Sequence, residues 1–122
     1  MGTVSVRYIV HDVDRAIGFY RDRLGFEVEL HPAPGFASLS RGDLRLLLNA
    51  PGAGGAGVAG GETPEPGGWN RFQIEVDDLE GLVAELRTVG ATFLGEITRG
   101  KGGKQILIAD PSNNVVELFE PF

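Results

Sequence analysis

The sequence contains no cysteine and only one tryptophan and one methionine in 122 residues. Without cysteine, disulfide frameworks, thiolate metal sites and a cysteine nucleophile are all excluded. No apolar run approaches the roughly 20 residues that a membrane-spanning helix needs. The first residues, Met1-Gly2-Thr3-Val4, have neither the basic segment nor the apolar core of a signal peptide. We therefore expect a cytoplasmic protein with no membrane partner.

Positive charge is also scarce. The chain has 11 Lys and Arg against 17 Asp and Glu, a formal net charge of -6. Lys and Arg form no stripe that would neutralise a row of phosphates, so nucleic acid is not an expected partner. The sequence shows no phosphate-binding loop, dinucleotide fingerprint or Ser-His-Asp arrangement, so kinase, dehydrogenase and hydrolase functions have no support.

The first 50 residues predict one helix among four strands. Apolar and polar residues alternate over 4–10, which is the period of a half-buried strand. Asp12 offers a helix N-cap, apolar residues recur at helical spacing, and Gly25 supplies a left-handed stop. Three apolar stretches follow at 26–30, 36–40 and 44–49, separated by turn formers at 31–35 and 41–43. The order is βαβββ.

The same order returns after residues 51–68, a stretch so rich in Gly and Pro that we expect a flexible connector. A strand through Phe72 and Ile74 precedes a cap at Asp77 or Asp78, a helical face over 79–89 and Gly90. Strands are predicted at 92–97, 105–109 and 115–119. The sequence thus predicts an α+β fold of two modules, 1–50 and 69–122. Each helix covers one face of its sheet, so the other faces form a cleft or meet a ligand or a second subunit.

Three segments carry a family resemblance. They are Val10-His11-Asp12-Val13 with its continuation to Phe26, then Glu75-Val76-Asp77-Asp78-Leu79, and finally Asp110-Pro111-Ser112-Asn113-Asn114 with its continuation to Pro121. In this order they resemble the vicinal oxygen chelate superfamily, which includes glyoxalase I, extradiol dioxygenases, fosfomycin-resistance enzymes and bleomycin-resistance proteins. The resemblance implies a single domain over 1–122, with two tandem βαβββ modules forming curved mixed sheets around a cleft, and a homodimer.

The third segment also has a physical interpretation. Asp110-Pro111 starts a turn, and Asn113 stands where the family usually has Gly, because Asn best tolerates a left-handed backbone. The turn delivers Glu117, which corresponds to a metal ligand in metal-binding members of the family.

The remaining ligand positions that the resemblance implies are not occupied by ligands. They fall on Ser5, on Arg71 and among Arg45, Leu46 and Leu47. A guanidinium is permanently charged and repels a cation. We therefore expect no metal and no cofactor, with Glu117 the only surviving ligand.

Strand alternation selects the residues on the faces opposite the helices. With two aromatic residues beside the Gly-rich and Pro-rich loops, the candidate ligand-binding residues are Ser5, Arg7, Phe36, Arg45, Leu47, Trp69, Arg71, Gln73, Glu117 and Phe119. We expect Arg71 and Glu117 to form an ion pair where the metal would lie, leaving Arg7, Gln73 and Trp69 to contact a small organic ligand. The alternative is that these residues face only water or a dimer partner, with Trp69 and Phe36 in a core or interface.

Three functions remain open at this point. The first is a metal-free binding protein that sequesters a bulky hydrophobic or cationic compound, as bleomycin-resistance proteins do. The second is an enzyme, either a metal-dependent lyase, isomerase or dioxygenase, or a metal-free acid-base catalyst that uses Glu117 or Glu75. The third is an accessory subunit that binds another protein. Loss of the metal ligands favours the first.

Overall fold

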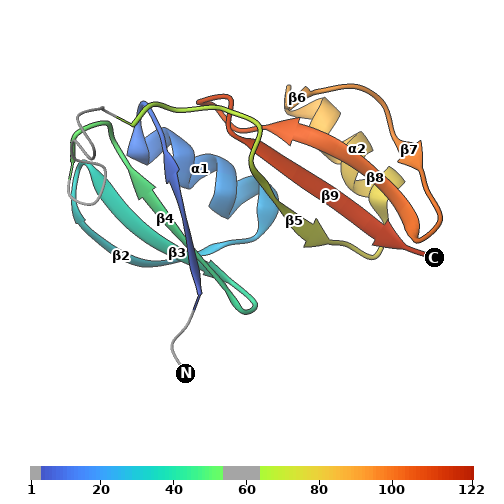
Figure 1. Ribbon diagram of the computed structural model, residues 1–122, viewed down its shortest axis with the longest axis horizontal. Helices are drawn as coiled ribbons and strands as arrows, with labels where there is room; N and C mark the ends of the chain where they lie inside the picture. Colours follow the sequence, from blue (N-terminus) through green and yellow to red (C-terminus); the bar gives the residue numbers. More distant parts are fainter. Residues whose placement is uncertain (1–3, 54–63) are drawn as a thin grey trace. The chain divides into compact units, whose positions relative to one another are not determined.

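The computed structural model describes residues 4–53 and 64–122, and the chain divides into two compact units, Met1–Gly67 and Gly68–Phe122. In its described part, each unit contains one sheet and one helix (Figure 1). Two sheets of mixed strand direction with one helix each confirm the predicted α+β class. Of the connector predicted over 51–68, residues 54–63 lie outside the described residues.

The first unit carries a four-stranded sheet in the order β1-β4-β3-β2. Its elements are β1 (Ser5–Ile9), α1 (Val13–Leu24), β2 (Glu27–Ala33), β3 (Phe36–Arg41) and β4 (Leu44–Asn49). β1 runs parallel to β4, and the other pairs are antiparallel. Helix α1 follows β1 in the chain, and this crossover allows β1 to pair in parallel with β4 rather than with β2.

Helix α1 begins and ends where the sequence predicts. Asp12 accepts a hydrogen bond from the backbone N–H of Arg15 at 3.2 Å, and Gly25 closes the helix with φ 75°. Tyr20 lies on the buried face of α1, where its ring meets Phe26 edge-on at 5.4 Å between centroids. The side chains of Leu39 and Leu46 are fully buried on the face of the sheet that α1 covers. The alternation of β3 and β4 therefore leaves their other residues on an open face.

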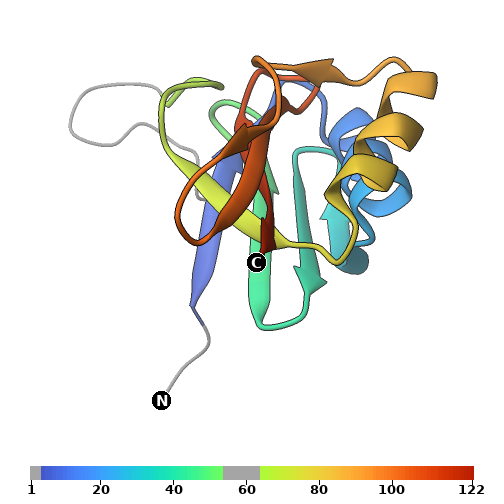
Figure 2. The ribbon, with the colours of Figure 1, turned by 90° about the vertical axis from the view of Figure 1, so that its right-hand side faces the viewer.

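The second unit repeats this arrangement with a five-stranded sheet in the order β5-β9-β8-β6, and β7 pairs with β8. Its elements are β5 (Arg71–Glu75), α2 (Leu79–Thr88), β6 (Thr92–Phe93), β7 (Thr98–Arg99), β8 (Gly103–Ala109) and β9 (Val115–Pro121). Of the two cap candidates, Asp78 is the one that accepts from Gly81 N, at 3.0 Å. Figure 2 shows α2 along one face of this sheet. Among the described residues, no helix has the length and apolar character to cross a membrane.

The turn before β9 forms as expected. Asp110 accepts two backbone hydrogen bonds through Oδ1, from Ser112 N and Asn114 N, each at 2.8 Å. Asn113 has φ 65°, and it is the one non-glycine residue with positive φ in the described part of the chain. This left-handed residue lets the chain reverse and start β9, which carries Glu117.

Two of the predicted strands were wrong in extent. β2 continues through His31, Pro32 and Ala33, which were expected to be a turn. Pro32 is accommodated because β2 is an edge strand whose ladder with β3 has register shifts, so the missing N–H costs little. The strand expected over 92–97 stops at Phe93 because the chain bends at Gly95, where φ is 106°.

A close approach of two strands explains a glycine at the start of β8. A methyl group on Gly103 would overlap the backbone oxygen of Glu120 and lie 2.9 Å from Cζ of Phe119. Gly102, its neighbour, has open space around the same position.

We predict that Gly103→Ala lowers the free energy of unfolding by about 1–3 kcal/mol, through forced displacement of β9. Urea denaturation measures it, with Gly102→Ala as the control that stays near the parent protein. Equal stability of the two variants would contradict so close an approach of β8 to β9.

Candidate functional site

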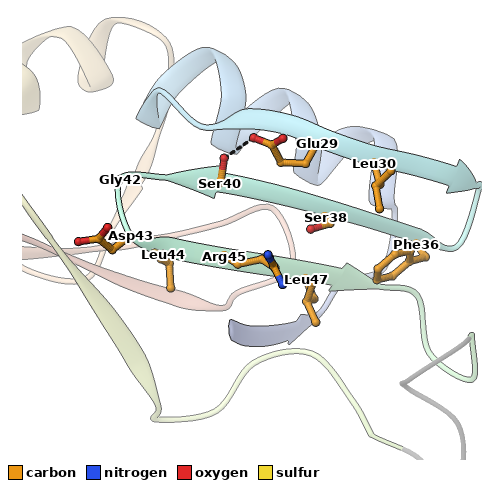
Figure 3. A pocket seen from close by; sticks show the side chains of 10 residues that line it. All are labelled: Glu29, Leu30, Phe36, Ser38, Ser40, Gly42, Asp43, Leu44, Arg45 and Leu47. Carbon is orange, nitrogen blue, oxygen red and sulfur yellow. Dashed lines mark hydrogen bonds between the residues drawn. The ribbon is translucent and has the colours of Figure 1, made fainter. Parts of the chain in front are cut away.

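The open face of the first sheet is hollowed into a pocket of about 750 Å³ (Figure 3). Residues of β2, β3, β4 and the turn at Gly42 line it. Alternation explains which side chains reach it. On β3, Phe36, Ser38 and Ser40 face the pocket, while Ala37 and Leu39 are buried on the opposite face. The pocket therefore lies on the side of the sheet that α1 does not cover.

Four apolar side chains line the pocket, and they are Leu30, Phe36, Leu44 and Leu47. Figure 3 shows three of them, Leu30, Phe36 and Leu47, toward one end. Leu30 is 60% exposed, so much of its surface is free to contact a bound molecule. This end suits a ring or another apolar group.

Five polar side chains complete the lining, namely Glu29, Ser38, Ser40, Asp43 and Arg45. Ser40 donates a hydrogen bond to Glu29 Oε1 at 2.5 Å. Ser38 is only 5% exposed, and within the described ranges neither it nor Arg45 has a side-chain hydrogen bond or ion pair. Unengaged polar groups beside an apolar surface are typical of sites that orient a small ligand.

Three predicted ligand-binding residues, Phe36, Arg45 and Leu47, lie together in this pocket. Ser5 and Arg7 lie on the neighbouring strand β1, opposite Arg45 and Leu47, and do not line it. Arg7 Nε instead donates to Asn49 Oδ1 at 3.0 Å.

Six lining side chains were not predicted from the sequence, and they are Glu29, Leu30, Ser38, Ser40, Asp43 and Leu44. Ser38 and Ser40 share the alternation of Phe36, so that signal was available. Glu29 and Leu30 are adjacent in sequence, and both line the pocket because the β2–β3 register shifts between Val28 and Leu30. Alternation alone does not predict such a shift.

In the second unit, a cluster of hydrogen bonds surrounds Glu117. Arg71 Nε donates to Glu117 Oε1 at 3.0 Å, and Gln73 Nε2 donates to Oε2 at 2.5 Å. The ion pair predicted between Arg71 and Glu117 is thereby confirmed. Register explains the contact, because β5 runs parallel to β9 with Gln73 opposite Glu117. Glu117 is only 8% exposed, so these two donors compensate for its loss of water.

The other candidates of the second unit are more accessible. Glu75 is exposed at the end of β5, and Phe119 opposite it is half-buried. Trp69 precedes β5 and is 90% exposed, so the alternative of a core position is wrong for it within this chain. The role of these residues in ligand binding stays a prediction.

The residues at the family's metal position do not fit a divalent cation. A cation there needs the carboxylate of Glu117 together with imidazole or carboxylate partners. Both oxygens of Glu117 instead accept from Arg71 and Gln73. A divalent cation bound there would compete with the guanidinium for a single carboxylate, and the two positive charges would repel each other.

Acidic side chains gather elsewhere, at the start of α2. Oxygens of Asp78, Glu80 and Glu120 lie within 4.8 Å of one another, the one such group among the described residues. Lys104 Nζ lies 2.5 Å from Glu80 and 3.6 Å from Glu120. Its hydrogen bond to Glu80 lowers the pKa of that carboxyl and raises the pKa of Lys104. Glu120 also accepts from Leu79 N at 2.8 Å, so this cluster anchors the helix.

Arg71 and Glu117 provide a direct test of the second unit. Because Glu117 is buried, we predict a coupling of about 1–3 kcal/mol between Arg71→Ala and Glu117→Ala in a double-mutant cycle of unfolding free energies. The exposed pair Arg87 and Glu96, at 3.1 Å in the same unit, serves as the control and should couple by less than about 1 kcal/mol. Equal coupling free energies in the two cycles would show that burial of Glu117 does not strengthen its interaction with Arg71.

Comparison with known proteins identifies the family. The model of the Glyoxalase/Bleomycin resistance protein/Dioxygenase superfamily matches residues 2–118. A bleomycin resistance protein of Geobacillus stearothermophilus is 26% identical over 120 residues, covering 91% of this chain and 90% of the relative. The solved lactoylglutathione lyase of Agrobacterium tumefaciens has a TM-score of 0.75 at 24% identity, covering 98% of this chain and 92% of that one. TnmS3, an antibiotic binding protein from Streptomyces sp. CB03234, has a TM-score of 0.74 at 22% identity, with coverage of 100% and 97%. A lyase and a binding protein thus share this fold, and the chain belongs to the Glyoxalase/Bleomycin resistance protein/Dioxygenase superfamily.

Proposed function

We propose that this protein binds a bulky organic compound on the open face of its first sheet and holds it without changing it chemically. The observation that carries the proposal is the state of Glu117. Its two carboxylate oxygens are engaged by Arg71 and Gln73, which leaves no ligand set for the metal chemistry of the family.

The pocket and the relatives support binding. A volume of about 750 Å³ falls in the usual range of small-molecule sites, and the lining mixes apolar walls with a few polar groups. One relative is named a bleomycin resistance protein, and one structural neighbour is described as an antibiotic binding protein. Sequestration of a toxic compound such as an antibiotic would make the cell resistant to it.

A homodimer and a cytoplasmic location belong to the same proposal. In each sheet, residues such as Arg45 and Arg71 lie on the face that the unit's own helix leaves open. A second copy of the chain is one way to cover such faces. Sedimentation equilibrium at micromolar concentration tests the dimer, and a monomer would remove this part of the proposal.

The carboxylates of the second unit do not favour catalysis. Acid-base catalysis would require Glu117 or Glu75 as a poised carboxylate. Glu117 is held by two donors, and Glu75 is exposed at the end of its strand.

Two exposed apolar residues on β2 allow a matched test with a neutral ring compound, anthracene-methanol. Leu30 lines the pocket, whereas Val28 on the same strand does not. We predict that Leu30→Ala weakens binding of anthracene-methanol about fivefold, because it removes apolar surface that the ring would cover. Val28→Ala should leave the affinity unchanged. Equilibrium dialysis, with the fluorescence of the ring as readout, measures both.

The compound recovered after dialysis should be chemically unaltered by mass spectrometry. Equal affinities of the Leu30 and Val28 variants would place binding outside the pocket. Conversion of the compound would contradict sequestration.

A further inference from the structure

The pocket of the first sheet presents its side chains in a fixed order. Across the strands, Ser38 of β3 lies opposite Leu47 of β4 and Leu30 of β2. One step further along β3, toward Gly42, Ser40 lies opposite Arg45. From the end at Phe36, a molecule lying in the pocket therefore meets an apolar section that contains the hydroxyl of Ser38, and then the carboxylate of Glu29 and the guanidinium of Arg45.

The hydroxyl of Ser38 is an unusual feature of that apolar section. Ser38 is only 5% exposed, its partners across the sheet are leucines, and its side chain has no hydrogen bond within residues 4–53 and 64–122. Figure 3 shows it between the two neighbouring strands of the pocket. Among the described residues no buried side-chain oxygen or nitrogen lacks a hydrogen-bond partner, so the unbonded hydroxyl of Ser38 is open to the pocket and free to take a partner there. A polar group on a bound molecule would supply that partner.

Arg45 provides the positive charge of the pocket. It is the one cationic residue in the lining, and none of the described residues forms an ion pair with it. Its planar fork of N–H groups matches the two oxygens of a carboxylate. Arg7, opposite Leu47 on β1, adds a second positive charge to the same face and uses its Nε on Asn49.

The two carboxylates of the lining are placed less favourably to bind a cation. Glu29 already accepts a hydrogen bond from the hydroxyl of Ser40. Asp43 lies in the turn between β3 and β4, beyond Arg45 as seen from Phe36 (Figure 3). Glu29 lies beside Leu30 on β2, about level with Arg45 along the strands (Figure 3), so a ligand that extends from the apolar end meets both groups. Of the two, Arg45 is the one without a hydrogen bond or ion pair among the described residues.

We propose that the natural ligand is a ring compound that carries a carboxylate. The ring packs against Phe36 and Leu47, and the carboxylate is held by Arg45 with Ser38 as a second donor. This assignment rests on the proposed function and narrows its ligand class from bulky organic compounds in general to anionic ones.

Three anthracene derivatives, each with one small substituent that is negative, neutral or positive, test the assignment by equilibrium dialysis. They are anthracene-carboxylate, anthracene-methanol and anthracenylmethylammonium. We expect the carboxylate to bind at least about tenfold more tightly than the alcohol, since a charge-assisted hydrogen bond to Arg45 forms only with the anion. The ammonium compound should bind more weakly than the alcohol.

Variants at the pocket then assign the charge recognition to a residue. Arg45→Met should weaken binding of the carboxylate about tenfold and binding of the alcohol by a much smaller factor, and Arg45→Lys should recover part of the loss for the carboxylate. Ser38→Ala should weaken the carboxylate about threefold. Arg23→Met, an exposed position on α1, removes the same charge from the other side of the sheet and should have no effect.

The outcomes separate this inference from the proposed function. If the ammonium compound binds as tightly as the carboxylate or more tightly, the ligand class is wrong while binding in the pocket stands. An equal effect of Arg45→Met and Arg23→Met on the carboxylate would also overturn the inference, because the attraction would then be unspecific. If none of the three compounds binds at millimolar concentration, both the inference and the proposed function fail.

Discussion

The whole arrangement depends on one constraint, the coverage of each sheet by a single helix. In the first unit, α1 contacts β2, β3 and β4, and the leucines of β3 and β4 that lie under it are fully buried. Strand alternation then sends every second side chain to the other face. That face holds Phe36, Ser38 and Arg45 in one unit and Arg71, Gln73 and Glu117 in the other. Both candidate sites are thus consequences of how the core is packed.

Electrostatics distinguishes this chain from a metal-binding member of its fold. A carboxylate that is 8% exposed must be compensated, and a metal ion, a guanidinium or a set of neutral donors can all do this. Here Arg71 and Gln73 fill that role from the adjacent strand β5. The same glutamate is therefore a structural partner rather than a free metal ligand, and the pocket of the other sheet is the site that we propose for binding. The fold alone does not decide between these uses, since its structural neighbours include a lyase and an antibiotic binding protein.

Much of this was predictable from sequence, and the exceptions have physical causes. Caps fixed both ends of α1, and the tolerance of Asn113 for a left-handed backbone fixed the turn that positions Glu117. The family resemblance places Arg71 and Glu117 together at the metal position, so their ion pair was predictable, and the parallel pairing of β5 with β9 brings them into contact. The end of β2 was not predictable. Turn-forming residues at 31–35 indicated a turn, but an edge strand tolerates Pro32, and β2 continues to Ala33. Glu29 and Leu30 were missed as pocket residues because a register shift breaks alternation between neighbouring strands. Ser38 and Ser40 were missed as pocket residues, although strand alternation places them on the same open face as Phe36.

The central claim is that the protein binds its ligand without a metal, because Glu117 is already paired. The most direct test is the metal content of the protein purified without chelator. Elemental analysis by mass spectrometry should find far less than one Zn, Fe, Mn or Ni per chain, because Glu117 is occupied by Arg71 and Gln73. A stoichiometric metal that is lost in Glu117→Ala would contradict the account and return the chain to the metal-dependent enzymes of its superfamily.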